Sequence, residues 1–175
     1  MAKTPDMTQD EARQARDVLL EQERVLRYES GFGSAEALEL GCILVSLASE
    51  FDETYVVIIV READGACVFQ WLPDDKGARN LGIAAGKCAE SLAVGHASPW
   101  RQALALMGEM ALDEVFADAP ARIAGCGAFP VRVGDEVVAI IGVSGLHNGL
   151  DHEVVVRALE KVLDKTVPHF LVALL

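Results

Sequence analysis

Two short runs of β-branched residues constrain the fold of this chain more than any other feature. Residues 55–60 read Tyr-Val-Val-Ile-Ile-Val, and residues 136–144 read Glu-Val-Val-Ala-Ile-Ile-Gly-Val-Ser. Apolar runs of this length without polar alternation are typical of strands that are covered on both faces. We therefore predict that Val56–Val60 and Val137–Val143 are neighbouring interior strands of one sheet, and that helices cover both of its faces.

Each of these runs has a hairpin partner beside it in the sequence. Ala63-Asp64-Gly65 carries an Asp-Gly turn signal, and the alternating residues 67–72 follow it as a half-buried return strand. A strand at 128–133 precedes the second run, and its Pro130 has no N–H for a sheet ladder, which indicates an edge position or the start of a strand. Helical patterns occupy most of the remaining chain, at residues 9–28, 34–51, 76–93, 98–111 and from 151 onward.

This order of elements predicts an α/β (α+β) fold, with a mainly antiparallel sheet and helices packed on it in two or three layers. Three polar residues are expected to cap their helices at the N-terminus. They are Ser34, Ser98 and Asp151. The length of 175 residues suits one domain, so we expect a loose tail at 1–8 and a single domain over 9–175.

The composition limits the class of partner and the cellular compartment. A formal net charge of −12 opposes binding to nucleic acid and to an anionic membrane surface. The N-terminus lacks the apolar region of a secretion signal, and no apolar run approaches the ~20 residues of a membrane helix. The four cysteines form no C-x-x-C pair. We therefore expect a cytoplasmic protein with reduced, buried thiols and no structural zinc site.

Three histidines are candidate ligands for a metal. His147 lies in the predicted loop at 145–150 and His152 just after it, and they could converge at one end of the sheet. His96 lies in another predicted loop, directly after Gly95. Imidazole binds iron and zinc, and a haem site needs as few as one such ligand. The alternative is that these are a helix histidine and two loop histidines that bind nothing.

Cations in acidic or apolar surroundings are candidate partners for a carboxylate ligand. Lys87, Arg101 and Arg132 are of this kind, and Arg132 alternates with apolar residues on its strand. The guanidinium fork matches the two oxygens of a carboxylate. The alternative is a set of ordinary ion pairs with the many acidic residues.

Several segments together resemble the GlcG/HbpS-like haem-degrading superfamily, and most closely its branch of small bacterial and fungal proteins without an assigned activity. The resemblance spans about residues 18–165 and rests on Leu20–Glu23, Ala37–Gly41, Gly127–Val133, Val143–Leu146 and Asp151-His152. It implies a profilin-like sandwich that assembles into a homo-oligomeric ring, with haem or a corrinoid bound at subunit boundaries in some relatives.

The first functional hypothesis is therefore a cytoplasmic, oligomeric protein that binds haem or a related tetrapyrrole. Its candidate axial ligands are His96, His147 and His152, and Lys87, Arg101 and Arg132 are candidates for the propionates. The second hypothesis is a non-catalytic oligomeric scaffold or adaptor without a small ligand. The third is an enzyme of unassigned chemistry, for which no nucleophile, base and orienting residue can be picked out.

The C-terminus is expected to contribute to self-association. Residues 170–175 read Phe-Leu-Val-Ala-Leu-Leu, which is apolar on every side. The mean hydropathy of +0.26 is also high for a chain of this charge. We expect this segment to be buried between subunits, while the alternative is a groove of its own subunit.

Overall fold

A computed structural model describes residues 7–147 and 149–170, and its centre is an antiparallel sheet. The strands are β1 (Val56–Arg61), β2 (Cys67–Trp71), β3 (Ala128–Val133) and β4 (Glu136–Ser144). They lie in the order β2-β1-β4-β3, and each pair of neighbours is antiparallel. The α+β class predicted from the sequence is confirmed, and Pro130 does lie on an edge strand.

The two β-branched runs are paired at the centre of the sheet, as predicted. Ile58 lies opposite Gly142, and Ile59 lies opposite Ile141. Alternate residues of β1 belong to separate hydrophobic clusters, since Val57 and Ile59 lie in one and Val56 and Ile58 in the other. Both faces of these strands are therefore buried, which explains why neither run alternates with polar residues.

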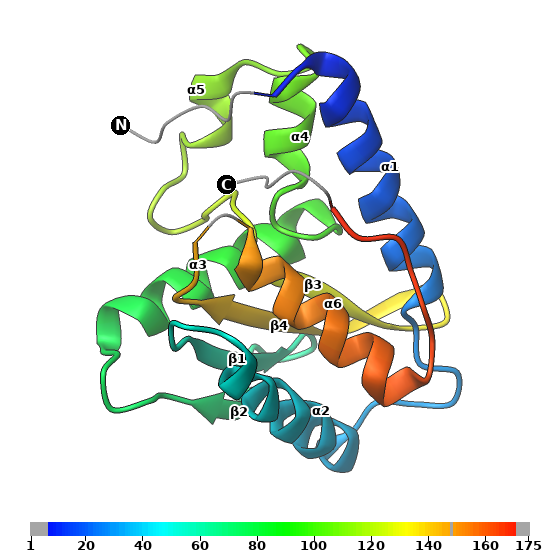
Figure 1. The fold of residues 1–175 in the computed structure, drawn as a ribbon, viewed down its shortest axis with the longest axis vertical. Coiled ribbons are helices and arrows are strands. Elements are labelled where there is room, and N and C mark those ends of the chain that lie inside the picture. The colour runs from blue at the N-terminus through cyan, green and yellow to red at the C-terminus, as the bar shows by residue number, and fades with distance from the viewer. Residues whose placement is uncertain (1–6, 148, 171–175) are drawn as a thin grey trace.

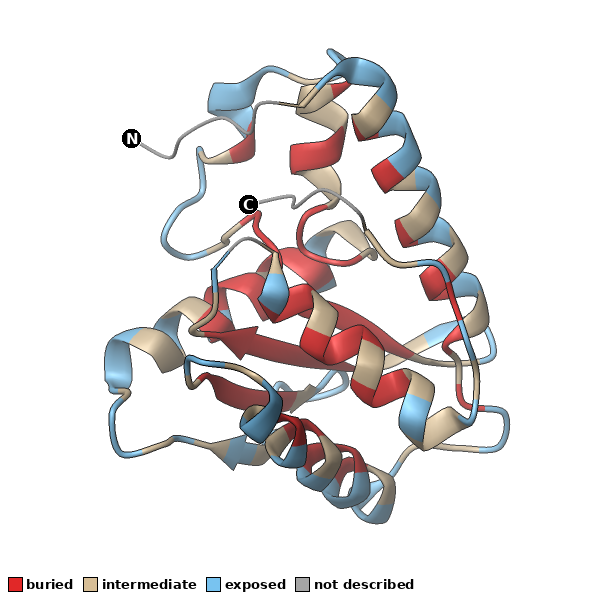
Figure 2. Ribbon diagram, in the orientation of Figure 1, coloured by how far each residue is buried: buried red, intermediate tan, exposed pale blue. Residues whose placement is uncertain are grey.

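Helices cover the two faces of the sheet, which makes the arrangement three-layered (Figures 1 and 2). Helix α3 (Ala78–Val94) packs on one face so closely that a Cβ atom at Gly142 would lie 2.5 Å from Sγ of Cys88. Helices α2 (Ser34–Ser46) and α6 (Leu150–Leu163) cover the other face. A 3₁₀ turn at Leu47–Glu50 continues α2, so the regular helix is shorter than the predicted 34–51.

A second group of helices packs beyond the β3 edge of the sheet. Helix α1 (Gln9–Val25) contacts α4 (Trp100–Leu106), and the short α5 (Leu112–Val115) follows in a region predicted as irregular. Thr8 caps α1 by accepting a hydrogen bond from the backbone N–H of Glu11. Residues 1–6 of the predicted tail lie outside the described residues.

The predicted helix caps at Ser34, Ser98 and Asp151 are wrong. Ser34 is the first helical residue, and Glu36 accepts a hydrogen bond from the backbone N–H of Gly33 before it. Ser98 is buried one residue before the cap position of α4, and its Oγ accepts from the backbone N–H of Ala128 at 2.9 Å. Asp151 lies inside the first turn of α6, and its buried carboxylate accepts hydrogen bonds from Lys87 and from the backbone N–H of Leu146 instead.

The expectation of buried thiols holds for two of the four cysteines. Cys88 and Cys126 are buried, whereas Cys42 and Cys67 are exposed. The exposed pair lies on the outer side of α2 and at the start of the edge strand β2, two positions whose solvent side has no covering layer. Within the described residues, no helix combines the length and the apolar character needed to cross a bilayer.

Candidate functional site

A buried ion pair joins α3 to α6 at one end of the sheet. Nζ of Lys87 lies 2.8 Å from Oδ2 of Asp151, and it also donates to the carbonyl oxygen of Val143 at 3.3 Å. The other carboxylate oxygen of Asp151 accepts from the backbone N–H of Leu146 at 2.9 Å. Lys87 is 7% and Asp151 5% exposed, so water screens this pair far less than an ion pair at the surface.

The close approach of these groups requires a glycine at position 127. Gly127 has a φ of +130°, a conformation that side chains disfavour. A Cβ atom there would lie 2.3 Å from the carbonyl oxygen of Val143 and 3.0 Å from Nζ of Lys87. Glycine therefore lets β3, β4 and the lysine meet at one point.

The sequence segments that carry the family resemblance converge around this pair and beside it. Gly127, Val143 and Asp151 belong to three of those segments, and all three contact Lys87 or lie next to it. A fourth segment supplies Gln22, whose Oε1 lies 2.8 Å from Nε2 of His152. These segments are far apart in the sequence, so the fold brings them together.

A cavity of about 290 Å³ opens beside the ion pair. We call it the Lys87 cavity. Lys87, Asp151 and His147 lie on its wall together with Gln102. The remaining lining residues are mostly apolar and comprise Phe116, Ile123, Ala124, Gly125, Cys126, Leu146 and Gly149. Two of the six predicted site residues, Lys87 and His147, therefore share one cavity.

His147 is the most accessible of the candidate ligands, with a side chain that is 74% exposed. Its Nδ1 lies 2.7 Å from a carboxylate oxygen of Glu53. Because a carboxylate accepts, Nδ1 is the donor in this contact, so the neutral form of the ring has its lone pair on Nε2. Histidines that bind metals in proteins commonly have this carboxylate partner on the other ring nitrogen.

His152 lies in the core, away from the exposed position of His147. It is 1% exposed and is packed between Phe129 and Phe170, whose ring centroids lie 5.9 and 4.9 Å from its own. Burial lowers the pKa of His152 to about 3, so its ring is neutral at physiological pH. Nδ1 is left without a hydrogen-bond partner among the described residues. The predicted convergence of His147 and His152 is not seen, because their rings have entirely different surroundings.

His96 and Arg132 meet near the start of α4, at a separate place. The His96 ring stacks on Trp100 with a centroid distance of 4.0 Å, and its Nδ1 lies 2.8 Å from Glu23. Arg132 donates to the carbonyl oxygen of Gly95 at 2.6 Å, directly beside His96 in the chain. The structure thus groups these two predicted residues with each other.

Arg101 is held by a third set of contacts. It forms a two-pronged ion pair with Glu90, which is fully buried, and Arg122 binds the same carboxylate at 3.0 Å. Asp118 lies 3.8 Å from Arg101 and 3.3 Å from Arg122. This network ties α3 to α4 and to the segment after α5.

Sequence reasoning missed most of the residues that line the Lys87 cavity, among them Gln102, Cys126 and Asp151. Gln102 is 2% exposed and lies on α4, where nothing in the sequence marks it as different from a surface glutamine. The sequence predicts Cys126 only as a buried thiol, and burial raises its pKa to about 12, so a thiolate is disfavoured. The sequence predicts Asp151 as a helix cap, whereas in the structure its carboxylate pairs with Lys87.

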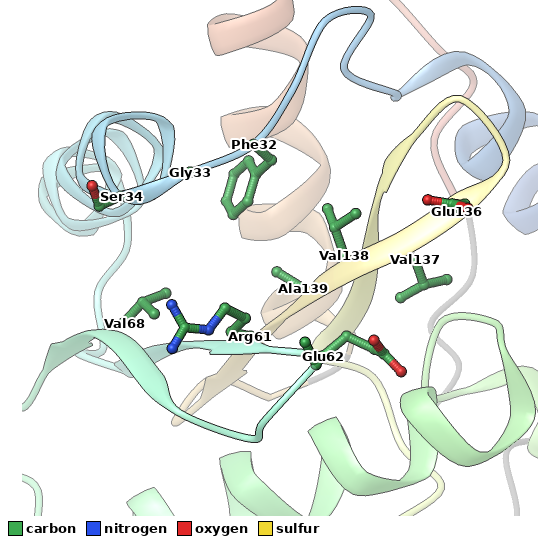
Figure 3. A pocket seen from close by; sticks show the side chains of 11 residues that line it. Phe32, Gly33, Ser34, Arg61, Glu62, Val68, Glu136, Val137, Val138 and Ala139 are labelled. Atoms are coloured by element: carbon green, nitrogen blue, oxygen red, sulfur yellow. The ribbon is translucent and has the colours of Figure 1, made fainter.

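A second cavity, of about 310 Å³, lies between the start of α2, the end of β1 and the start of β4 (Figure 3). Phe32, Val68 and Val138 lie on its wall, and Arg61 reaches toward it. The Arg61 guanidinium is engaged with Asp64, with Nε at 2.9 Å from the carboxylate. None of the six predicted site residues lines this cavity.

Solved structures with the same fold include Ybr137w, HbpS and a complex of PduOC with haem. Ybr137w has a TM-score of 0.74 and 22% identity, over 85% of this chain and 87% of that one. A double mutant of Streptomyces reticuli HbpS has a TM-score of 0.61 and 22% identity, over 78% and 89%. The PduOC:haem complex has a TM-score of 0.63 and 17% identity, over 75% and 94%. These similarities define the fold class.

The sequence itself identifies the family. The sequence model of the family of haem-degrading HbpS-like proteins matches residues 32–160, well over half of the chain. This chain therefore belongs to the HbpS-like haem-degrading family. No functionally curated protein matches it in sequence.

Proposed function

We propose that this protein binds haem or a related tetrapyrrole, as a homo-oligomer in the cytoplasm. Membership of the HbpS-like family supports the ligand class, and so does the fold shared with PduOC, which has been solved with haem bound. Family and fold alone do not decide which residues hold a ligand, so the assignment rests on the Lys87 cavity.

The observation that carries this proposal is the pairing of His147 with Glu53. Nδ1 of His147 faces the carboxylate, which directs Nε2 of the neutral ring to a ligand, and the ring lies at an exposed edge of the cavity. These are the properties of an axial ligand that iron can reach without rearrangement of the core. The residues present therefore fit haem, with His147 as the first ligand and Glu53 orienting it.

The other residues of the cavity can serve the rest of the macrocycle. Phe116, Ile123 and Leu146 offer apolar contacts to its hydrocarbon surface. Lys87 uses two of its three N–H groups in the structure, which leaves one for a propionate oxygen. Bound haem would supply an iron centre whose reactivity depends on the axial ligand and on the polarity of its surroundings.

His96 and His152 remain as alternative ligands, and Arg101 and Arg132 as alternative partners of the propionates. Each of the four is already held by protein contacts that a ligand would have to replace or share. His152 is moreover enclosed in the core. The structure thus favours His147 over the other two histidines on the ground of access.

Self-association is the second part of the proposal, and exposed apolar residues support it. Leu38 on α2 is 59% exposed, and Val68 and Leu72 at the β2 edge are 37% and 40% exposed. Helix α2 packs on β2, so these residues belong to one region of the fold. Residues 171–175 of the apolar C-terminus lie outside the described residues. The same exposed region would also support the alternative hypothesis of a scaffold or adaptor without a small ligand.

The test of the ligand proposal is an absorption spectrum of the purified protein with added hemin. Histidine ligation should produce an intense Soret band, and replacing His147 by alanine should weaken it. A flat difference spectrum at micromolar hemin would leave the scaffold or adaptor role as the better account.

A further inference from the structure

The last described residues form a segment without regular secondary structure that runs from the end of α6 back along α1 (Figure 1). We call residues 165–170 the C-terminal strap. Nε2 of Gln22 on α1 donates to the carbonyl oxygen of Pro168 at 2.8 Å, and the backbone N–H of Val167 donates to Glu160 on α6 at 2.8 Å. Contacts of individual side chains therefore hold the strap, in place of a helix or a sheet ladder.

The strap covers the ring of His152, which is only 1% exposed. The Phe170 ring lies against it with a centroid distance of 4.9 Å, although Phe170 itself is only partly buried. Covering the His152 ring has a cost, because its Nδ1 has no hydrogen-bond partner among the described residues. Other contacts of the strap have to offset this cost to keep the strap in place.

His169 fastens the strap to α6 through both nitrogens of its ring. Nδ1 lies 2.8 Å from Glu153, and Nε2 lies 3.1 Å from Glu160. A carboxylate only accepts hydrogen bonds, so both contacts are satisfied only when both ring nitrogens carry a proton. The neutral ring has a single N–H, which leaves one of the carboxylates facing a lone pair. This clamp is therefore complete only while His169 is a cation.

The other groups around the clamp do not replace the charge of His169. In the part of the chain that the structure describes, no lysine or arginine forms an ion pair with Glu153 or Glu160. Glu11 of α1 lines the same small cavity as His169 and adds a further carboxylate. His152 beneath the strap is neutral, because burial lowers its pKa to about 3. Once His169 loses its proton, no cation therefore holds the strap to the two carboxylates.

His169 can exchange its proton with solvent while the protein stays folded, since its side chain is 31% exposed. Burial lowers the pKa of His169, but the contacts with Glu153 and Glu160 outweigh this effect and raise the pKa above 6.5. The stabilisation that the clamp gives to the strap is therefore present at low pH. It is lost as the pH rises through the pKa of His169 in the folded protein.

We propose that the C-terminal strap is a pH-sensitive cover over His152, closed while His169 is protonated and displaced when His169 is neutral. In the closed state, Phe170 lies on the His152 ring and the backbone N–H of Val167 donates to Glu160. In the displaced state, both contacts are broken and the His152 ring becomes accessible to solvent. This inference stands whether or not haem binds, because the strap does not line the Lys87 cavity.

The first test is amide hydrogen exchange of the full chain at the Val167 N–H, from mildly acidic to mildly alkaline pH, relative to the intrinsic rate at each pH. We expect the protection to fall at least about tenfold as His169 loses its proton, because a charge-assisted hydrogen bond is lost. His169→Gln should be weakly protected at every pH. His169→Lys should stay protected throughout, because its ammonium keeps its charge in this range. The matched control His147→Gln, at an exposed position, should follow the wild type.

The second test measures access to His152 with diethyl pyrocarbonate, which modifies accessible neutral imidazole rings, and locates the modified residue by mass spectrometry. His152 should be modified faster in wild type at alkaline pH and in His169→Gln at every pH, and it should stay unmodified in His169→Lys. Thermal unfolding of each variant shows that it is folded. Constant protection of Val167 across the pH range, a wild-type profile in His169→Gln, or equal modification of His152 at both ends of the range would overturn the proposal. A flat Soret titration would count against haem binding alone.

Discussion

Lys87 on α3 and Asp151 on α6 form an ion pair at 2.8 Å in which the two side chains are only 9% and 7% exposed. Replacing Lys87 by methionine leaves the carboxylate buried and unpaired, so the free energy of unfolding should fall by about 3–5 kcal/mol. Adding Asp151→Asn should restore part of this loss, since the amide still accepts from the backbone N–H of Leu146. Urea unfolding measures both values.

The matched control for this pair is an ion pair at the surface. Arg24 and Glu21 lie 2.6 Å apart on α1, with side chains that are 67% and 39% exposed. Because water screens such pairs, Arg24→Met should change the free energy of unfolding far less than Lys87→Met does. Equal effects of Lys87→Met and Arg24→Met would mean that the buried pair does not hold α3 to α6.

His152 should lower the free energy of unfolding at acidic pH, below the pH at which a histidine in the unfolded chain titrates. Burial lowers its folded pKa from 6.5 to about 3, so the unfolded chain takes up the proton first. The contribution of His152 to the free energy of unfolding is therefore complete above pH 6.5 and is lost as the pH falls below this value. The loss approaches about 1.4 kcal/mol per pH unit. Unfolding of wild type and His152→Gln between neutral and mildly acidic pH measures it, and equal slopes would contradict the assignment.

His169 acts in the opposite direction and is the control for this experiment. Burial lowers the pKa of His169, but its contacts with Glu153 and Glu160 outweigh this effect and raise the pKa overall. Its contribution to stability is present at low pH and is lost as the pH rises through its folded pKa. In His169→Gln, the fall in stability toward acidic pH should therefore be steeper than in wild type.

The two central strands should not accept a charge on the face that α3 covers. Ile58 and Ile140 are 5% and 2% exposed and belong to the same hydrophobic cluster. Ile58→Asp or Ile140→Asp should each cost several kcal/mol, because a buried carboxylate finds no partner there. Thermal unfolding measures the cost. Gln70→Asp on the exposed edge strand β2 is the control, and normal melting of both isoleucine variants would refute the packing described above.

The oligomer proposal predicts a native mass well above 18.7 kDa in light scattering. Deleting residues 171–175 keeps the contact of Phe170 with His152 and the hydrogen bond from Gln22 to Pro168, so the subunit should still fold. We expect the shortened chain to have a smaller mass. A monomeric wild type would refute self-association, and an unchanged oligomer would remove residues 171–175 from its interface.

The sequence predicted those parts of this structure that depend on local pattern. The pairing of β1 with β4 was predicted from the apolar run in each strand, and the edge position of β3 was predicted from Pro130. Each of these signals lies within the sequence of one strand. The Lys87 cavity depends on tertiary contacts instead. Asp151 has the position of a helix cap, and only the approach of α3 shows that its carboxylate serves Lys87. His147 and His152 are five positions apart, yet the start of α6 between them separates an exposed ring from a core ring.

The most direct test of haem binding is a hemin titration followed at the Soret band, on wild type, His147→Ala and Glu53→Gln. The wild type should give an intense band that saturates with hemin, because Nε2 of His147 is free to bind iron. The band should be weak in His147→Ala and shifted to higher hemin concentration in Glu53→Gln, whose amide orients the ring less strongly than the carboxylate at 2.7 Å. His169→Gln is the control and should match wild type. A flat difference spectrum in the wild type, or an unchanged band in His147→Ala, would contradict the proposed site.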